Sequence, residues 1–451
     1  MALAPLPQPL DFTVRRRPPQ LVPPAEPTPR EIKHLSDIDD QEGLRSYIPL
    51  IFVYPKNCSM EGVDPAKFIR TAIAKALVFY YPFAGRLREG AGRKLTVDCT
   101  GEGVMFTEAD ADVTLDAFGD ALHPPIPRLD ELIYPVGGSG EFLNFPLLLF
   151  QVTRLRCGGF IFTISQNHAI SDAPGLSKFL NAVVEMARGA TSPSVLPVWK
   201  RELFSARNPP CVTYKHPEYD VLPQSKVTTM PSDNIMLHRA FFFGPAHLSS
   251  LRRSLPPHLR NRSTFEVLTA FLWRCRTMAL GYHPDDEVRA LCIVNLRSRT
   301  TGLGSSIPPG YYGNALAHVA AITTAGELTR NPLGYAVELI MKVKGVVSEE
   351  YMKSLVDFLV IKGRPGYNMT RTYLVSDVTR AGLSEFDFGW GKPRYGGPAK
   401  GTVAGFHIPY KNKRGEEGIL VPIRLPAIAM DRFAKEIEKL EGDESLVKSS
   451  L

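Results

Sequence analysis

The sequence LLLFQVTRLRCGGFIFTISQNHAISDAPGLSKFLNAVVEMARG, residues 147–189, decides the fold of the first half of this 451-residue chain. Its first part is rich in β-branched and aromatic residues on both sides of Gly158-Gly159, which predicts two strands joined by a turn. Its last part has apolar residues at helical spacing, Pro174 in the first turn and Gly189 as the stop signal. His168 and Asp172 therefore lie where a strand ends and a helix begins, so that a side chain on a fixed backbone can face a ligand.

The composition is that of a globular soluble protein, with 44% hydrophobic and 22% charged residues. The length permits two or three domains. Its six cysteines are scattered singly, so we expect neither a zinc site nor a disulfide framework. The order of apolar and basic residues near Met1 is wrong for a secretory signal, and the longest apolar runs are too short to span a bilayer. These features predict a soluble cytoplasmic protein without a membrane partner.

The formal net charge of +7 would suit a polyanionic partner such as nucleic acid, a membrane surface or a phosphorylated cofactor. Apart from Arg15 to Arg17, however, the basic residues are dispersed among acidic ones, and no basic stripe interleaved with aromatic residues occurs. We therefore expect no nucleic-acid partner. A basic solvated surface accounts for most of these charges.

The order of elements in the first half follows from its apolar runs and its prolines. Residues 1–30 are proline-rich and predict an irregular arm, and residues 36–44 (SDIDDQEGL) predict a polar turn. A buried strand is expected at residues 47–54, followed by a helix that starts at Pro65 and must end by Pro82. Residues 93–99 and 103–109 then predict a meander of strands.

A proline-rich stretch between residues 191 and 226 is the expected crossover between two halves. We therefore place a first domain at 1–190, a crossover at 191–226 and a second domain at 227–451. The second half predicts strands at 238–244, 288–296, 373–378 and 418–425, with helices starting at Ser263, near Asn331 and at Pro426. Alternating strands and helices predict an α/β fold with mixed sheets.

A histidine and an aspartate four residues apart occur twice, at His168 and Asp172 and at His216 and Asp220. The second pair lies in the crossover with neither a strand before it nor a helix after it, which favours a solvated loop. For His168 two interpretations stay open: a core histidine at a strand end, or a general base, since an imidazole titrates near ~6.5. Asp172 is well placed as a helix N-cap, which indicates an orienting, structural role.

Three motifs, YYPFAGRL at 80–87, HAISD at 168–172 and DFGWG at 387–391, resemble the plant BAHD acyltransferases in order and separation. The resemblance spans nearly the whole chain, and stretches such as PPGYYGN and NPLGYAVELI resemble the alcohol acyltransferase branch. It implies two similar-sized domains with mixed sheets flanked by helices, the acyl-CoA-dependent, chloramphenicol acetyltransferase-like architecture, with the active-site channel between the domains. It also implies a monomer that uses acyl-CoA as a co-substrate, without a metal or a permanently bound cofactor.

The resemblance also implies roles for individual residues. His168 matches the base that deprotonates an alcohol as it attacks the thioester, and Asp172 matches an aspartate that pairs with an arginine, here Arg297 or alternatively Arg299. For the DFGWG motif the resemblance implies structural roles, at Asp387, Gly389, Trp390 and Gly391. For the strand before it, the resemblance implies a place in the acceptor-pocket wall, at Ser376 and Val378. The family usually has glycine directly after the aspartate, whereas Ala173 and Pro174 stand here before Gly175.

The phosphates of coenzyme A need cationic or backbone N–H donors, and a basic turn ahead of the helix at Ser263 offers both. The expected contacts are Arg253, Arg260, Arg262 and Ser263, with Arg252 in the same turn. A plain basic surface turn is the alternative interpretation. The loop at 392–401, with Lys392, Arg394 and Lys400 among glycines, is a second possible phosphate site.

The function expected from the resemblance is the transfer of a benzoyl, anthraniloyl or acetyl group from CoA to benzyl alcohol, methanol or another small alcohol. Acylation of an amine, or a silent module that binds acyl-CoA or a small ligand without turnover, are the alternatives. The final tripeptide, Ser449-Ser450-Leu451, faintly resembles a peroxisomal S-K-L address, so a peroxisomal location is the alternative to the cytoplasm.

Overall fold

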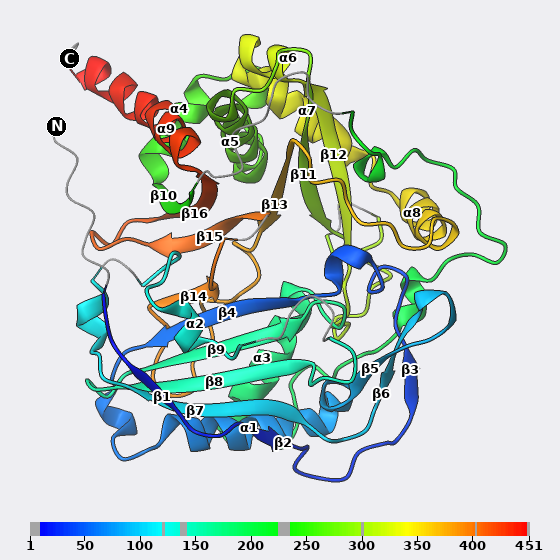
Figure 1. Cartoon of the computed structure of the whole chain (residues 1–451), viewed down its shortest axis with the longest axis vertical. Helices are drawn as coiled ribbons and strands as arrows, with labels where there is room; N and C mark the ends of the chain where they lie inside the picture. Colours follow the sequence, from blue (N-terminus) through cyan, green and yellow to red (C-terminus); the bar gives the residue numbers. More distant parts are fainter. Residues whose placement is uncertain are drawn as a thin grey trace.

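The structure is a computed structural model that describes residues 10–119, 122–135, 142–223, 235–298, 302–401 and 404–448. Within these residues the strands form a seven-stranded sheet, a six-stranded sheet and a small three-stranded sheet. The seven-stranded sheet lies in the lower half of Figure 1 and the six-stranded sheet in the upper half. Helices pack on both sheets, so the fold is α/β with mixed sheets, as the sequence predicts.

The seven-stranded sheet is built around the predicted hairpin of residues 147–167. Its strand order is β1-β7-β8-β9-β4-β14, with β2 also paired to β7, and all neighbours are antiparallel except β7 and β8. The strands are β1 (Val14–Arg16), β2 (Gln20–Val22), β4 (Tyr47–Tyr54), β7 (Val104–Ala111), β8 (Leu148–Leu155), β9 (Phe160–Asn167) and β14 (Tyr395–Pro398).

The six-stranded sheet has the order β10-β16-β15-β13-β11-β12, with parallel pairing on both sides of β13. Its strands are β10 (Met236–Phe243), β11 (Glu287–Asn295), β12 (Leu316–Thr324), β13 (Thr372–Asp377), β15 (Ala404–Lys411) and β16 (Glu417–Pro426). The three-stranded sheet is antiparallel and joins β3 (Ile32–His34), β6 (Leu95–Asp98) and β5 (Arg86–Glu89).

The helices cover the two large sheets in separate groups (Figure 1). The helices α1 and α3 pack against each other in the lower half, whereas α5 packs against α4, α6, α7 and α9 in the upper half. In chain order the helices are α1 (Pro65–Phe79), α2 (Leu129–Leu132), α3 (Ala173–Ala187), α4 (Pro245–Arg253), α5 (Thr264–Leu280), α6 (Ala325–Arg330), α7 (Leu333–Gly345), α8 (Glu349–Ile361) and α9 (Ala427–Lys448). Among the described residues, no helix is both long and apolar enough to cross a membrane.

Two hydrophobic cores form, one in each half, but the chain does not divide cleanly between them. Residues 383–395 of the second half contribute Leu383, Phe386, Phe388 and Trp390 to the first core. The strand β14 follows directly and pairs with β4 of the first sheet. The domain boundaries at 190 and 226 therefore stay a prediction, because a C-terminal segment crosses into the N-terminal core.

The DFGWG motif is a tight turn held by its own aspartate. One carboxylate oxygen of Asp387 accepts the N–H groups of Gly389 and Gly391, each at 2.8 Å. Both glycines have positive φ, 114° and 87°, which side chains other than hydrogen rarely tolerate. Trp390 between them is 4% exposed and packs edge-to-face on Phe68 and Phe160.

Several elements differ from the prediction. The N-terminal arm is not fully irregular, because β1 and β2 pair with β7, and the predicted meander is wrong, because β6 and β7 belong to different sheets. The strands β12 and β15 and the helix α8 were not predicted. Three alanines weaken the apolar pattern of β12, and Gly405 and Pro409 interrupt that of β15.

Replacing Trp390 by alanine should lower the free energy of unfolding by about 3–5 kcal/mol, because a buried indole is removed from between two aromatic rings. The midpoint of urea denaturation would measure the loss. Val221→Ala is the control, since Val221 is 87% exposed and its loss should cost less than about 0.5 kcal/mol. Equal midpoints for Trp390→Ala and the wild type would show that the motif does not anchor the core.

Candidate active site

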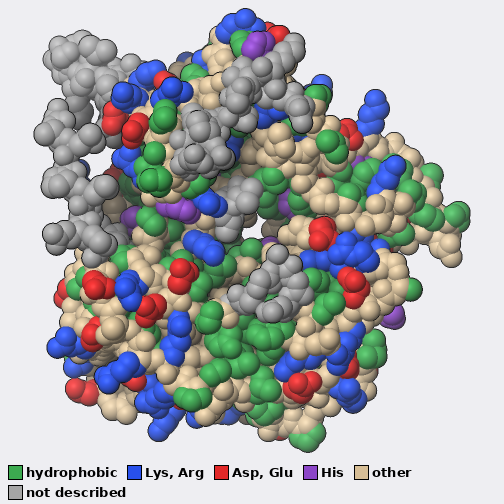
Figure 2. All heavy atoms as spheres, viewed as in Figure 1, with side chains coloured by type: hydrophobic (Ala, Val, Ile, Leu, Met, Phe, Trp, Pro, Cys, Tyr) green, Lys and Arg blue, Asp and Glu red, His purple; other side chains and the backbone are tan. Residues whose placement is uncertain are grey.

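A cavity of about 150 Å³ lies between the two large sheets and contains His168 in its wall. The first sheet supplies Leu50 and Pro398, the second sheet Ile293 and Phe406, and the start of α3 supplies Pro174 and Leu176. Most of the lining is apolar, and Figure 2 shows the surface hollowed between the two halves. The predicted pocket residues Ser376 and Val378 both line this cavity.

The backbone on both sides of the His168 side chain is fixed. The His168 N–H donates to the Ser46 carbonyl at 2.8 Å, and its carbonyl accepts from Asn314 Nδ2 at 2.8 Å. The imidazole is half-buried, and its Nδ1 has no hydrogen-bond partner among the described residues. The His168 backbone is therefore fixed from both halves of the chain, and its side chain lies in the cavity wall.

Asp172 accepts hydrogen bonds from three directions at once. Arg297 donates to both carboxylate oxygens, at 2.7 and 3.1 Å, which is the ion pair that the resemblance implies. The N–H of Gly175 donates at 2.9 Å, which makes Asp172 the N-cap of α3, and the N–H of Ala315 donates at 2.9 Å. Both carboxylate oxygens are therefore occupied by donors from α3, from Arg297 and from the backbone at Ala315. The alternative partner Arg299 lies outside the described residues.

Ala173 is accommodated without loss of the helix start. It is the first residue of α3 after the N-cap, with Pro174 in the first turn. The close approach occurs two residues later, at Gly175, where a Cβ would lie 2.2 Å from the Tyr312 carbonyl oxygen and 2.3 Å from Ser171 Oγ. Glycine is therefore needed at 175, and the residue directly after the aspartate is tolerant in this chain.

A second histidine stands close to His168. His318 on β12 is buried, and its Nδ1 lies 2.6 Å from the Tyr367 hydroxyl. Burial, and secondly the nearby charge of His168, lowers the pKa of His318 to about 3. His318 is therefore neutral at physiological pH and places no positive charge beside His168.

The basic turn expected to contact coenzyme A lies at the N-terminus of α5. The Arg252 guanidinium donates to the carbonyls of Arg260 and Arg262, which folds the turn over itself. Ser263 and Glu266 form the predicted capping box. The neighbouring Phe265 lies against His407 of β15, with 5.6 Å between ring centroids, one residue from the cavity-wall residue Phe406. The turn and the cavity are thus connected through a single strand.

His216 is not in a solvated loop, so that expectation was wrong for this residue. It is buried, with Nε2 3.0 Å from Ser354 Oγ, because the unpredicted helix α8 covers it with Tyr351 and Phe358. The Ser354 hydroxyl also accepts the N–H groups of residues 213 and 214, so these hydrogen bonds attach the crossover segment to α8. Asp220 is exposed, as expected.

Sequence reasoning missed three residues that hold the His168 loop. Asp39, Arg201 and Asn314 are all buried, and they bond to one another and to the carbonyls of residues 168 and 170. Their positions, 39, 201 and 314, are far apart in the chain. The one available signal was the dense acidic stretch SDIDD, which reads as a surface turn until its partners are known.

Comparison with known proteins places these features in context. A family model described as "Transferase family" matches residues 12–440. Benzyl alcohol O-benzoyltransferase of Petunia hybrida is 63% identical over 444 residues, 97% of this chain and 96% of that protein. The crystal structure of vinorine synthase superposes with a TM-score of 0.73 at 22% identity, covering 95% of this chain and 98% of the other. That of F. graminearum TRI101 complexed with ethyl coenzyme A has a TM-score of 0.69 at 17% identity, covering 90% and 97%.

His407 beside the cavity wall gives the stability a pH dependence. It is fully buried, and neither ring nitrogen has a hydrogen-bond partner among the described residues. Burial lowers its pKa to about 4, although the Asp377 charge acts in the opposite direction. Between pH 6.5 and about 4 the unfolded chain binds a proton at this histidine that the folded chain does not bind, so acid destabilises the fold in that window.

His407→Gln should reduce the slope of unfolding free energy against pH by up to about 1.4 kcal/mol per pH unit between pH 6.5 and 4. Denaturation midpoints measured across this range would test it. His258→Gln is the matched control, because the His258 side chain is 66% exposed. An unchanged slope in the His407 variant would mean that this histidine is already protonated in the folded protein.

Proposed function

The chain belongs to the Transferase family, that of the BAHD acyltransferases, and from this membership and the cavity geometry we propose its substrates and the roles of its residues. It is an acyl-CoA-dependent alcohol O-acyltransferase of the alcohol acyltransferase branch. The observation that carries this conclusion is the 63% identity with a benzyl alcohol O-benzoyltransferase along nearly the full length of both proteins. The same relative favours an alcohol over an amine as the acceptor.

We propose that His168 is the general base. Its imidazole takes the proton of the acceptor hydroxyl while the alcohol oxygen forms a bond to the thioester carbonyl carbon. The carbon–sulfur bond then breaks, and the CoA sulfur leaves with the proton held by His168, so that the histidine ends neutral. The fixed backbone of His168 and its place in the cavity wall support this role. Asp172 and Arg297 orient the loop and take no part in proton transfer.

We propose benzoyl-CoA and benzyl alcohol as the preferred pair of substrates. A largely apolar cavity of about 150 Å³ has room for one benzene ring. Ile293, Leu316 and Phe406 offer apolar surface to such a ring. Acetyl or anthraniloyl donors, and methanol as acceptor, are the other pairs to compare.

We propose that the turn before α5 binds the phosphates of coenzyme A, through Arg253, Arg260, Arg262 and Ser263. The 17-residue helix α5 offers backbone N–H groups and a positive dipole end at this turn. Its connection through β15 to the cavity supports the assignment. The dispersed basic charge argues against a nucleic-acid partner. We further propose a cytoplasmic monomer without a membrane partner; the C-terminal tripeptide lies outside the described residues.

His168→Ala should lower kcat by about 10²- to 10⁴-fold, the range expected for loss of a general base. Thiol release from benzoyl-, acetyl- and anthraniloyl-CoA, each with benzyl alcohol, methanol and hexanol, would measure it and rank the substrates. His258→Ala controls for loss of an exposed histidine. A folded His168→Ala protein with wild-type kcat would refute the base assignment, and release without added alcohol would indicate hydrolysis.

Arg262→Ala should raise KM for the acyl-CoA about tenfold and leave kcat and the KM for the alcohol nearly unchanged, because a phosphate contact acts equally on ground and transition states. Steady-state kinetics with dephospho-CoA esters would locate the phosphate involved. Arg330→Ala serves as control, since Arg330 is a 71% exposed arginine on α6. An unchanged KM for acyl-CoA would shift the assignment to the loop at 392–401.

A further inference from the structure

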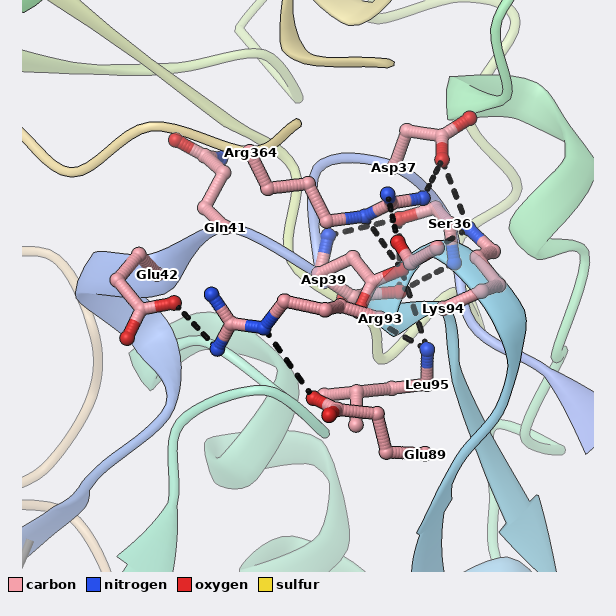
Figure 3. A network of polar contacts seen from close by, with 12 residues as sticks. Ser36, Asp37, Asp39, Gln41, Glu42, Glu89, Arg93, Lys94, Leu95 and Arg364 are labelled. Carbon is pink, nitrogen blue, oxygen red and sulfur yellow. Dashed lines mark hydrogen bonds and ion pairs between the residues drawn. The ribbon is translucent and has the colours of Figure 1, made fainter. Parts of the chain in front are cut away.

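The turn formed by residues 36–45 is a buried, charged element that joins the two halves of the molecule. Figure 3 shows Ser36, Asp37 and Asp39 on this turn, with Lys94 from the three-stranded sheet and Arg364 from the end of α8 turned towards it. Asp39 and Asp40 are both fully buried. Carboxylates so placed need close partners, because burying an unpaired charge is costly.

The two neighbouring aspartates have separate sets of partners. Asp40 bonds to Arg45, Lys94 and Arg364 and to the Leu95 amide. Asp39 instead receives Arg201 Nη1 on both oxygens at 2.9 Å. Asn314 also donates to Asp39, through its backbone N–H at 3.0 Å and its side-chain Nδ2 at 2.8 Å.

Asp39 also accepts the N–H and the hydroxyl of Ser36 on its own turn, whereas its other two partners, Asn314 and Arg201, also bond to the loop that carries His168. Asn314 Nδ2 also donates to the His168 carbonyl at 2.8 Å. Arg201 Nη2 donates to the Ile170 carbonyl at 2.8 Å, and its guanidinium stacks on Trp199 at 4.3 Å. A single carboxylate thereby fixes two groups that hold the backbone at residues 168 and 170.

We propose that Asp39 is a positioning residue for His168: through Asn314 and Arg201 it sets the place of the imidazole relative to the reacting thioester. The proposal rests on the proposed role of His168 as the base. Asp39 does not touch the cavity, so it acts only through its two partners. A displaced base loses rate in the chemical step, whereas the substrates still bind to the unaltered cavity walls.

The experiment compares Asp39→Asn, Asn314→Ala, the double variant and Asp40→Asn by steady-state kinetics and thermal denaturation. Asp39→Asn and Asn314→Ala should each lower kcat about 10- to 100-fold, with both KM values within about threefold of the wild type. The loss of kcat in the double variant should be smaller than the product of the two single losses, because the two changes act on one connected set of hydrogen bonds. Asn314→Ala removes no charge and decides the matter if Asp39→Asn does not fold.

Asp40→Asn is the matched control, since it removes an equally buried charge from the adjacent residue. Among the described residues, no hydrogen bond or ion pair of its partners Arg45, Lys94 and Arg364 reaches residues 168–172. Asp40→Asn should lower the unfolding temperature while kcat stays within about threefold of the wild type. Wild-type kcat in folded Asn314→Ala, or an equal loss of kcat in Asp40→Asn, would overturn the proposal. His168→Ala is assayed in parallel: wild-type turnover there would refute the base itself, whatever the Asp39 variants show.

Discussion

Two buried carboxylates, Asp39 and Asp172, accept hydrogen bonds from the same short segment, residues 314–315, and the geometry of the site depends on these bonds. Consecutive backbone N–H groups, those of Asn314 and Ala315, donate to the two different aspartates. Each aspartate is neutralised by its own arginine, Arg201 or Arg297, and each arginine also donates to a backbone carbonyl nearby. Every charge in this cluster is therefore paired and hydrogen-bonded, which is the condition under which buried ions are tolerated. Loss of one partner of either ion pair leaves the other charge uncompensated, so the two pairs have little freedom to shift.

In this arrangement Asp172 holds the loop of His168, the proposed base, without a hydrogen bond to its imidazole. In a serine-type triad the carboxylate bonds to the imidazole, whereas here the carboxylate of Asp172 is occupied by Arg297 and two backbone N–H groups. His168 lies in the cavity wall, its buried Nδ1 has no hydrogen-bond partner among the described residues, and its neighbour His318 is neutral, since burial lowers the pKa of His318 to about 3. An alcohol that attacks a thioester needs only a transient proton acceptor, and no covalent acyl-enzyme has to be stabilised. A lone, firmly held imidazole is sufficient for that chemistry.

The sequence predicts what local patterns determine and misses what distant contacts determine. The hairpin, the α3 start at Asp172 and the capping box at Ser263 rest on a few neighbouring residues, and all three are present. Alanines in β12, and a glycine and a proline in β15, weaken the local strand pattern, and both segments are strands because neighbouring strands pair with them. The same holds for the site: His168 has a local signature, whereas Asp39 acquires its place from partners 162 and 275 positions away. No local pattern distinguishes such a residue from the acids of a surface turn.

The DFGWG turn shows how a motif remote from the base can still shape the cavity. Asp387 pairs with Arg188 at the C-terminal end of α3, the helix whose N-cap is Asp172. The preceding residue, Phe386, accepts a hydrogen bond from Tyr54 at the end of β4 through its carbonyl. From this anchor the chain enters β14, which supplies Pro398 to the cavity, and then β15, which supplies Phe406. The turn therefore anchors the C-terminal segment in the first core. The two apolar cavity walls that follow in the chain, Pro398 and Phe406, are placed from this anchor. A change in this motif would therefore alter the shape of the cavity and the stability of the fold. It would leave the His168 loop in place, because the hydrogen bonds that hold this loop come from the segments at Asp39, Arg201 and Asn314.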